Sequence, residues 1–424
     1  MCHGSGTEAR VLTVNSFLEG AVKITGHKTF LVDAHRTNFI FVKLWTDAGY
    51  EGVGEATAEW NEKAIVAAIE ELGEFLIGKD PFQTDYLVHI MHRNSYWRTG
   101  VILRSALSGV EAAMLDIKGK ALGVPVYELL GGKHRDAVAC YGNGWFSGAR
   151  TAEDFARKAA ETIAMGFKAL KWDPFGAAYL EMDRAARNRT IEIVEAVRAA
   201  VGPDIDLMIE VHGRLNVPTA IAMARELAKF NPRWLEEPLP PESIDALADV
   251  RANSPVAIAT GERYFEPERF MELIYKRAAD IVQPDVGHVG GMLEAQKIAA
   301  MAHARFLPVA PHNPTGPVMN AMTLQLAATI PNFCILETIA VDVPWRKEIV
   351  RESLVFTNSE IRIPDAPGLG VELDEEGCAR HPYVRHPIRQ FDPDAVFSRP
   401  AGSVPFVRSG GAGANGPIPA PAEA

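Results

Sequence analysis

The chain has 424 residues, enough for more than one domain, and 47% of them are hydrophobic, which supplies material for a large core. Its 43 basic against 54 acidic residues give a formal net charge of −11, which disfavours nucleic acid and anionic membrane surfaces as partners. The four cysteines are scattered, the N-terminus is too polar for a signal peptide, and no apolar stretch reaches roughly 18 residues, so we expect a cytoplasmic protein without disulfide framework, zinc module or membrane span.

The first third of the chain predicts a run of strands followed by a run of helices. Strands are expected over 11–17, 39–45 and 52–54. Helical patterns follow over 62–77, 84–96 and 103–121. This order is typical of an α+β domain, which we assign to residues 1–135, with residues 1–9 expected to fray.

From residue 136 to 345, short apolar strands alternate regularly with amphipathic helices. Eight strand candidates lie at 138–141, 169–172, 207–211, 233–235, 256–260, 280–283, 307–310 and 333–336. Because eight strands can close a ring, this alternation predicts an α/β domain, a (β/α)8 TIM-type barrel, rather than an open sheet. The stretch 393–424 is rich in glycine, proline and alanine and is expected to be a flexible tail.

Three glutamates follow apolar runs at equal spacing: Glu210, Glu236 and Glu262 are each 26 residues apart. One strand, one helix and two loops fill a segment of that length, so we expect the carboxylates at the same end of three successive barrel strands. Converging carboxylates repel one another unless a cation lies between them, and hard oxygen ligands favour Mg²⁺. A single glutamate at a strand end is usually a solvated loop residue, but three in register predict a metal site at the barrel mouth.

The next strand ends supply a candidate base. Strand six ends in Asp285 and strand seven in His312, so the carboxylate is expected to orient the imidazole and raise its basicity. Such a base can remove a proton α to a carboxylate, and Mg²⁺ can stabilise the resulting enediolate as a Lewis acid.

Three further residues suit contacts with a carboxylic acid substrate. Lys171 on strand two and Glu337 on strand eight could contact its carboxylate oxygens, Glu337 on condition that a proton is shared. His212, next to the metal, could protonate a departing hydroxyl. Each also has a plainer interpretation: Lys171 and Glu337 as structural partners, and His212 as a residue that caps a strand or binds water.

Loop residues form a weaker group of substrate-binding candidates. His35 and Trp60 lie in loops of the N-terminal domain that could close over the pocket, and Trp345 follows strand eight. Polar and aromatic loop residues are more often simply solvated. Asp173 at the end of strand two is equally open, because Asp173-Pro174 is also a typical turn start.

The strand-end residues resemble those of the enolase superfamily, mandelate racemase subgroup. The matching positions are Lys171, Glu210, Glu236-Glu237-Pro238, Gly261-Glu262, Asp285 and His312-Asn313. The resemblance implies a barrel with an N-terminal α+β capping domain, completed by a C-terminal segment over 346–392 that returns to the cap. It also implies Mg²⁺ as cofactor, a lysine or histidine base acting through an enediolate, and a homo-oligomer.

Two details of the resemblance bear on the reaction. Racemases carry Lys-x-Lys on strand two, whereas Asp173 occupies the second position here, which argues against a two-base racemisation. Residues 209–214 resemble the strand-three motif of acid-sugar dehydratases of the D-galactonate and D-gluconate type, in which the histidine at the position of His212 expels the β-hydroxyl. Glu210 replaces the commoner aspartate and lengthens that ligand arm.

The expected activity is a Mg²⁺-dependent dehydration of an aldonate or aldarate to a 2-keto-3-deoxy acid, a carbon–oxygen lyase reaction. A cycloisomerase or epimerase that uses the same enediolate is an alternative, and a non-catalytic barrel that binds a small molecule is another. A metal-dependent aldolase is disfavoured by the separate cap and by the pairing of Asp285 with His312. The expected partner is a small sugar acid.

Overall fold

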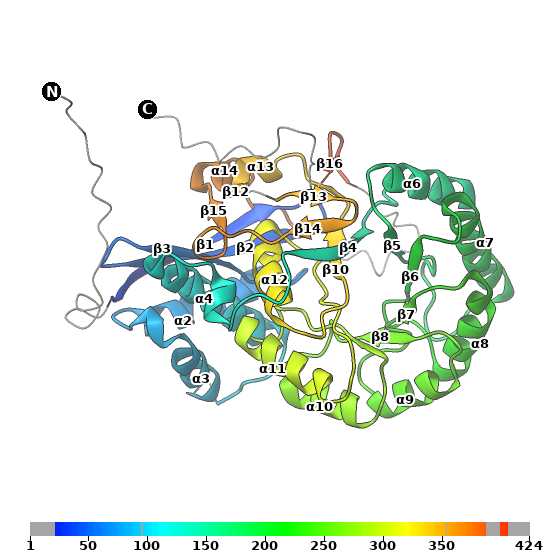
Figure 1. Cartoon of the computed structure of the whole chain (residues 1–424), viewed down its shortest axis with the longest axis horizontal. Coiled ribbons are helices and arrows are strands. Elements are labelled where there is room, and N and C mark those ends of the chain that lie inside the picture. The colour runs from blue at the N-terminus through cyan, green and yellow to red at the C-terminus, as the bar shows by residue number, and fades with distance from the viewer. Residues whose placement is uncertain (1–21, 95, 353, 387–398, 406–424) are drawn as a thin grey trace.

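The computed structural model describes residues 22–94, 96–352, 354–386 and 399–405, which form a cap beside a barrel (Figure 1). The strand predicted over 11–17 and the fraying predicted for 1–9 lie outside the described residues. Among the helices of these segments, none has both the length and the apolar run that a bilayer span requires.

The cap contains a three-stranded antiparallel sheet covered by helices. Strands β1 (Ile24–Asp33), β2 (Asn38–Thr46) and β3 (Glu51–Glu55) pair in chain order. The helices are α2 (Glu62–Leu76), η1 (Pro81–Gln83), α3 (Thr84–Asn94), α4 (Val101–Leu122) and α5 (Val126–Leu129). Strands β2 and β3 and helices α2, α3 and α4 confirm the prediction. Strand β1 has no predicted counterpart, because partly exposed positions interrupt its buried ones and leave no continuous apolar run.

Helix α4 packs its backbone directly against β3. A Cβ added at Gly54 would lie 1.9 Å from the carbonyl oxygen of Gly109, and one at Gly52 would lie 2.1 Å from that of Ala113. Glycine is therefore required at both positions of β3 for the helix to approach this closely.

The barrel strands form a closed ring of parallel pairs. Six pair in chain order: β4 (Ala137–Asn143), β5 (Ala169–Trp172), β6 (Asp206–Glu210), β7 (Trp234–Glu236), β8 (Ile258–Thr260) and β9 (Ile281–Val282). The last strand, β10 (Leu336–Ile339), pairs with β4. Between β9 and β10, bridges from Val282 to Val309 and from Val309 to Phe333 complete the ring. The predicted strand at 307–310 is thus present as single bridges rather than as a continuous strand.

Seven helices connect the eight strand positions and form the outer layer (Figure 1). They are α6 (Ala152–Ala164), α7 (Arg184–Val201), α8 (Val217–Leu227), which continues into η2 (Ala228–Phe230), α9 (Ile244–Asn253), α10 (Pro267–Tyr275), α11 (Met292–His303) and α12 (Pro317–Thr329). After β10, the short β11 (Val341–Asp342) and the four-residue α13 (Arg346–Ile349) take the place of an eighth long helix.

Inside the ring, one residue from each strand position builds a buried apolar floor. Its members are Tyr141, Ala169, Met208, Trp234, Ala259, Ile281, Ala310 and Ile335. Because strand side chains alternate between two faces, positions two residues further along lie on the same inward face. These positions are Asn143, Lys171, Glu210, Glu236, Gly261, Gln283, His312 and Glu337. A polar layer therefore rests on the apolar floor at the carboxyl ends of the strands.

The chain after the barrel returns to the cap, as the resemblance implies. Strand β12 (Val350–Glu352) pairs with β15 (Val371–Leu373), and α14 (Glu375–Arg380) follows. At the start of α14, Glu375 binds Lys28 of β1 and Lys43 of β2. The C-terminal segment is thereby tied to the cap sheet.

Residues after the barrel also add strands on the barrel side of the molecule, at β4 and at β11. The hairpin of β13 (Phe356–Thr357) and β14 (Glu360–Arg362) adds to the sheet at β4. Of the flexible tail predicted over 393–424, the structure describes residues 399–405, where β16 (Val404–Pro405) pairs with β11 and the N–H of Arg399 donates to Ser147; residues 393–398 and 406–424 lie outside the described residues. The pairing partner lies far back along the chain, so local composition carried no sign of it.

Two buried carboxylates of the cap hold it to the barrel by capping barrel helices. Glu111 on α4 accepts hydrogen bonds from the backbone N–H groups of Met292 (3.1 Å) and Leu293 (2.8 Å) in the first turn of α11. Glu55 at the end of β3 accepts from those of Gly316 (2.8 Å) and Met319 (2.8 Å) at the start of α12.

Glycine stands at the N-cap of both helices and makes room for these carboxylates. A Cβ at Gly291 would lie 2.4 Å from Cδ of Glu111, and one at Gly316 would lie 2.4 Å from Oε1 of Glu55. Neither helix has a side-chain cap of its own. The cap domain thus supplies the hydrogen-bond acceptors that the N-terminal N–H groups of each helix need.

Replacing Glu111 by glutamine tests this docking. Burial raises the pKa of Glu111 from 4.5 to about 8, so the folded protein holds a proton that the unfolded chain releases. The group's stabilising contribution is therefore fully present below pH 4.5 and is lost as the pH rises through 8. We expect Glu111→Gln to lower the free energy of unfolding by about 1–3 kcal/mol at low pH, because the amide leaves one helix N–H unpaired. The difference should shrink above pH 8.

Chemical denaturation across this pH range measures the effect. The matched control is Glu71→Gln on the exposed face of α2, which should leave the stability curve unchanged. Stability curves of wild type and Glu111→Gln that run parallel with pH would contradict the assigned titration.

Candidate active site

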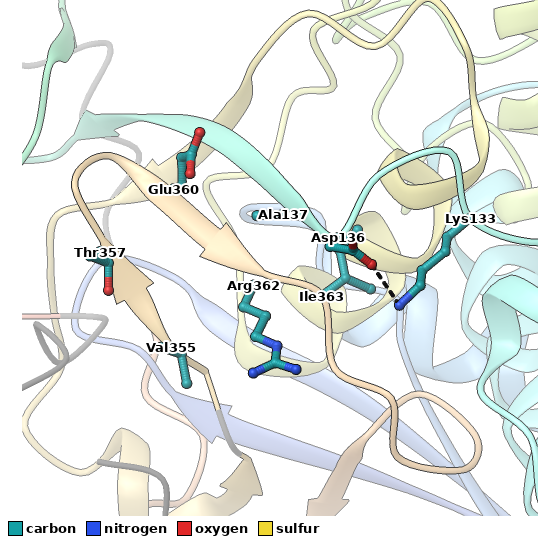
Figure 2. Close-up of a pocket in the computed structure, with 8 residues that line it drawn as sticks. All are labelled: Lys133, Asp136, Ala137, Val355, Thr357, Glu360, Arg362 and Ile363. Carbon is teal, nitrogen blue, oxygen red and sulfur yellow. Dashed lines mark ion pairs between the residues drawn. The ribbon is translucent and has the colours of Figure 1, made fainter. Parts of the chain in front are cut away.

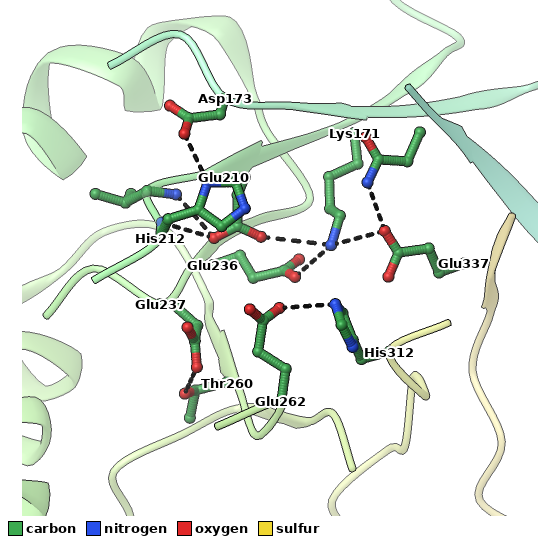
Figure 3. A network of polar contacts seen from close by, with 12 residues as sticks. Lys171, Asp173, Glu210, His212, Glu236, Glu237, Thr260, Glu262, His312 and Glu337 are labelled. Atoms are coloured by element: carbon green, nitrogen blue, oxygen red, sulfur yellow. Dashed lines mark hydrogen bonds and ion pairs between the residues drawn. The ribbon is translucent and has the colours of Figure 1, made fainter. Parts of the chain in front are cut away.

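The three glutamates converge at the mouth of the barrel, as the spacing predicts (Figure 3). Glu210 and Glu236 are the last residues of β6 and β7 and lie opposite each other in the parallel pair, and Glu262 follows β8 closely. One carboxylate oxygen from each lies within 4.8 Å of the others. Oxygen atoms this close can share one cation.

The two carboxylate oxygens of Glu210 differ in their contacts, and the Lys171 ammonium lies 3.4 Å from Oε2. Glu210 Oε1 accepts from the backbone N–H groups of Val211 (3.0 Å) and His212 (2.8 Å), whereas its Oε2 is buried and accepts no hydrogen bond from the described residues. Burial and the Glu210 carboxylate raise the pKa of Glu236 to about 8, which reports the repulsion between these charges. Mg²⁺ fits such a donor set, because it prefers oxygen ligands and would offset the repulsion.

Lys171 and Glu337 lie beside the triad in the same polar layer. Lys171 Nζ is 2.5 Å from Glu236 Oε1, 3.0 Å from Glu337 Oε1 and 3.4 Å from Glu210 Oε2. Burial opposes the charge on Lys171, yet Glu236 and Glu337 hold its pKa well above the usual value. The ammonium group is therefore a fixed positive charge at the rim of the triad.

Glu337 is held as a carboxylate by several donors. Its oxygens accept from Asn143 Nδ2 (2.7 Å) and from the backbone N–H of Asn313 (3.1 Å). Burial opposes ionisation, but Lys171, His312 and these hydrogen bonds lower the pKa of Glu337 to about 2. The expected contact of Glu337 with a substrate carboxylate needs a proton shared between the two groups, and this low pKa disfavours such a proton. Glu337 holds Lys171 through their ion pair.

His312 and Asp285 form the predicted pair. His312 Nδ1 lies 2.6 Å from Asp285 Oδ2, and the other ring nitrogen, Nε2, lies 3.3 Å from Glu262 Oε2. Burial works against charge on the ring, but Glu262 and Asp285 raise the pKa of His312 to about 10. A cation bound at Glu262 would offset that carboxylate and lower this pKa, because positive charge disfavours protonation of a nearby imidazole.

A second histidine–carboxylate pair lies on the other side of the triad (Figure 3). His212 Nδ1 is 2.6 Å from Asp173 Oδ2, and Arg214 binds the same oxygen. Strand β6 ends at Glu210 and His212 has a left-handed backbone (φ 51°), so a tight turn rather than strand alternation directs its ring. The side chain is 40% exposed, and against the effect of burial Glu210 and Asp173 raise its pKa to about 9. Both carboxylates therefore favour the protonated form of His212.

Asp173 orients His212, a role that was not predicted. Burial opposes its ionisation, but Arg214, His212 and the backbone N–H of Phe175 lower its pKa to about 2. These partners occupy both carboxylate oxygens, and the contact of Asp173 with substrate stays a prediction. Strands β5 and β6 are neighbours, so the adjacency that pairs Asp285 with His312 was also the available signal for this pair.

A charged pair from two cap loops also reaches the mouth. Arg36 binds Glu59, which was not among the predicted site residues. Against the effect of burial, Arg36, His312 and His212 lower the pKa of Glu59. This carboxylate of the cap therefore lies within electrostatic reach of both site histidines.

The three loop candidates differ in their surroundings. The indole N–H of Trp60 is buried without an acceptor among the described residues, so Trp60 remains a candidate for substrate binding. The backbone N–H of His35 donates to Asp33 Oδ1 (2.9 Å), which fixes the loop but assigns no role to the ring. Trp345 donates its indole N–H to the Asp33 carbonyl (2.8 Å) and stacks on His381, so it ties the C-terminal segment to the cap, and its contact with substrate stays a prediction.

A separate hollow of about 500 Å³ lies at the opposite end of β4 (Figure 2). Its lining consists of Lys133, Asp136, Ala137, Val355, Thr357, Glu360, Arg362 and Ile363. Ala137 is the first residue of β4, whereas the polar layer stands at the carboxyl ends of the strands. The hollow therefore contains none of the predicted site residues.

Two family models together match most of the chain. The model for the mandelate racemase / muconate lactonizing enzyme N-terminal domain matches residues 14–131, and the model for an enolase C-terminal domain-like unit matches residues 154–377. The first contains the cap and the second contains the glutamate triad and both histidine pairs.

Several curated relatives are sugar-acid dehydratases by name. The D-galactonate dehydratase of Variovorax paradoxus (strain S110) is 35% identical over 86% of this chain and 98% of its own length. The D-gluconate dehydratase of Thermoproteus tenax is 35% identical over 79% of this chain and 68% of its own length. The D-xylonate dehydratase of Haloferax volcanii is 35% identical over 85% of this chain and 89% of its own length.

Solved structures show the same likeness. A mandelate racemase/muconate lactonizing enzyme from a Sulfitobacter species superposes with a TM-score of 0.81 at 32% identity, covering 86% of this chain and 96% of the other. A protein like it from Rubrobacter xylanophilus superposes with a TM-score of 0.80 at 34% identity, covering 86% and 98%. The chain therefore belongs to the mandelate racemase / muconate lactonizing enzyme family of the enolase superfamily, as its strand-end residues predict.

Proposed function

We propose that this chain is a Mg²⁺-dependent dehydratase of a sugar acid, an aldonate or aldarate, and hence a carbon–oxygen lyase. The observation that carries the proposal is the presence of two histidine–carboxylate pairs beside one glutamate triad. Dehydration needs two proton transfers, one from carbon to a base and one from an acid to the leaving hydroxyl. The names of the galactonate, gluconate and xylonate dehydratase relatives support the same substrate class.

In the proposed reaction, His312 accepts the C2 proton of the substrate at Nε2. Its Nδ1 is bonded to Asp285, which fixes the ring and leaves Nε2 facing the triad. Mg²⁺ bound by Glu210, Glu236 and Glu262 would supply Lewis-acid stabilisation of the charge that develops on the substrate carboxylate. Lys171 adds a second positive charge beside the same site, within 3.4 Å of Glu210.

His212 then donates a proton to the C3 hydroxyl as the C–O bond breaks and water leaves. Its neighbouring carboxylates keep the ring protonated for this step, and Asp173 holds Nδ1. The remaining ring nitrogen, Nε2, is the atom that transfers the proton. The enol that remains tautomerises to a 2-keto-3-deoxy acid.

An epimerase or cycloisomerase would share the removal of the C2 proton but would not expel water. A racemase would need a second base at the position of Asp173, where Arg214 and His212 occupy the carboxylate and lower its pKa to about 2. A carboxylate so stabilised is a poor base for a carbon acid. The site therefore favours elimination of water over inversion.

A library of aldonic and aldaric acids tests the proposed activity directly. We expect at least one acid to yield a 2-keto product that forms a semicarbazone and has lost one water by mass spectrometry. EDTA should abolish turnover and Mg²⁺ should restore it, because the triad needs a cation. A product of unchanged mass would indicate an isomerase instead, and no product together with no C2 exchange in D2O would indicate a binding protein.

His312→Asn tests the base. We expect kcat to fall by about 10²–10⁴-fold or more, because the variant lacks the accepting nitrogen. Mg²⁺ affinity, measured by calorimetry, should be retained, since His312 is not a ligand. His303→Asn on the exposed end of α11 is the matched control. A His312→Asn enzyme that keeps near-wild-type turnover would disprove the assignment.

His212→Asn separates the two proton transfers. We expect dehydration to fall by about 10²–10⁴-fold, because the leaving hydroxyl loses its acid. Exchange of the C2 proton with D2O, followed by NMR, should continue, because His312 and Asp285 are unchanged. Equal loss of exchange and dehydration would place His212 in the C2 step instead.

A further inference from the structure

We propose that His288 is a positioning residue for the base, holding Asp285, and through it His312, at a place set by the cap domain. The inference rests on the proposed function, because it takes His312 as the base. It assigns a role to a residue that lies outside the glutamate triad and outside both histidine–carboxylate pairs.

A tight turn brings the His288 ring back to the carboxylate three residues before it. The backbone N–H groups of His288 and Val289 both donate to the carbonyl of Asp285 at 3.0 Å, and that of Gly287 donates to Asp285 Oδ1 at 2.7 Å. In this turn, His288 Nδ1 lies 3.5 Å from Asp285 Oδ2, the oxygen that also binds His312. The carboxylate is thus contacted from two sides by imidazole rings.

The far side of the His288 ring is anchored in the cap. Its Nε2 lies 3.1 Å from the carbonyl oxygen of Thr57, and because a carbonyl only accepts, this nitrogen donates the hydrogen bond. Nδ1 therefore attracts the Asp285 carboxylate in the doubly protonated form of the ring, in which both nitrogens carry a proton. Thr57 is itself fixed, since its hydroxyl donates to Glu55 Oε1 (2.6 Å) and accepts from the backbone N–H of Ile40 (2.9 Å). The ring, only 13% exposed, therefore spans from the cap to Asp285.

The same cap segment also fixes the loop that carries His312. Glu55, two residues before Thr57, accepts from the backbone of Gly316 and Met319, shortly after His312 in the chain. Asp285 and the loop that carries His312 are therefore both connected to the same short segment of the cap, which contains Glu55 and Thr57. Displacing a general base by about 1 Å can lower the rate about 10²-fold. Losing the connection to the cap should therefore have a measurable effect on the rate.

The charge around Asp285 is consistent with this arrangement. Burial opposes its ionisation, but His288 and His312 together with the N–H of Gly287 lower the pKa of Asp285. The two rings lie 6.5 Å apart between centroids, at an interplanar angle of 42°.

Two amide substitutions separate the contacts of the ring. In His288→Asn the amide nitrogen lies near the place of Nδ1 and keeps the contact with Asp285, whereas in His288→Gln it lies near Nε2 and keeps only the contact with Thr57. We expect His288→Gln to lower kcat about tenfold or more with unchanged KM, because the substrate itself is not touched. His288→Asn should recover only part of the loss, because it keeps the contact with Asp285 but loses the anchor on Thr57, and His303→Gln on the exposed end of α11 should match wild type.

A spectroscopic signal checks the positioning without substrate. The short His312–Asp285 hydrogen bond should give a far-downfield proton resonance, assigned by its absence in His312→Asn. We expect this resonance to shift or broaden in His288→Gln and to return in part in His288→Asn, while Mg²⁺ binding shows that each variant is folded.

The proposal is overturned if His288→Gln keeps wild-type kcat and resonance, or if His288→Asn is no better than His288→Gln. If wild type itself lacks dehydratase activity, the proposed function fails, yet the resonance still reports whether His288 positions the pair.

Discussion

Electrostatic repulsion among buried carboxylates is the constraint on which the rest of this site depends. Glu210 and Glu236 end neighbouring strands and share their surroundings with Glu262, so each raises the cost of charging the others. Within the chain, Lys171 and the His312 ring contribute opposing positive charge at 2.5 Å from Glu236 and 3.3 Å from Glu262. A bound divalent cation would complete this compensation, since one carboxylate oxygen of each glutamate lies within 4.8 Å of the others.

The two histidines of the site have the same kind of support but different exposure. His312 is held by Asp285 and His212 by Asp173, each through Nδ1 at 2.6 Å. His312 is 14% exposed and lies against the triad, where a cation would weaken its hold on a proton, whereas His212 is 40% exposed on a turn beside Arg214. One fold thereby provides a base and an acid from the same side-chain type, distinguished by their neighbours.

The cap does more than cover the barrel, because its carboxylates complete barrel helices. Glu111 and Glu55 take the N-cap positions that Gly291 and Gly316 leave open, and the helices they cap follow the strands that carry Asp285 and His312. Glu59 extends the same domain to the mouth itself. The hydrogen bonds that dock the cap are therefore connected to those that place the Asp285–His312 pair.

The sequence by itself determined the barrel, the glutamate triad and the pairing of Asp285 with His312. Spacing and strand periodicity are local properties, so β5 was predicted at its observed bounds, and the equal spacing of Glu210, Glu236 and Glu262 placed them at one end of the ring. Only the tertiary structure decided the contacts between residues whose partners lie on other elements. It assigned Asp173 to His212, brought Glu59 to the mouth, and engaged Trp345 with Asp33. Such contacts depend on barrel closure and on the docking of the cap, and neither leaves a periodic signal in the chain.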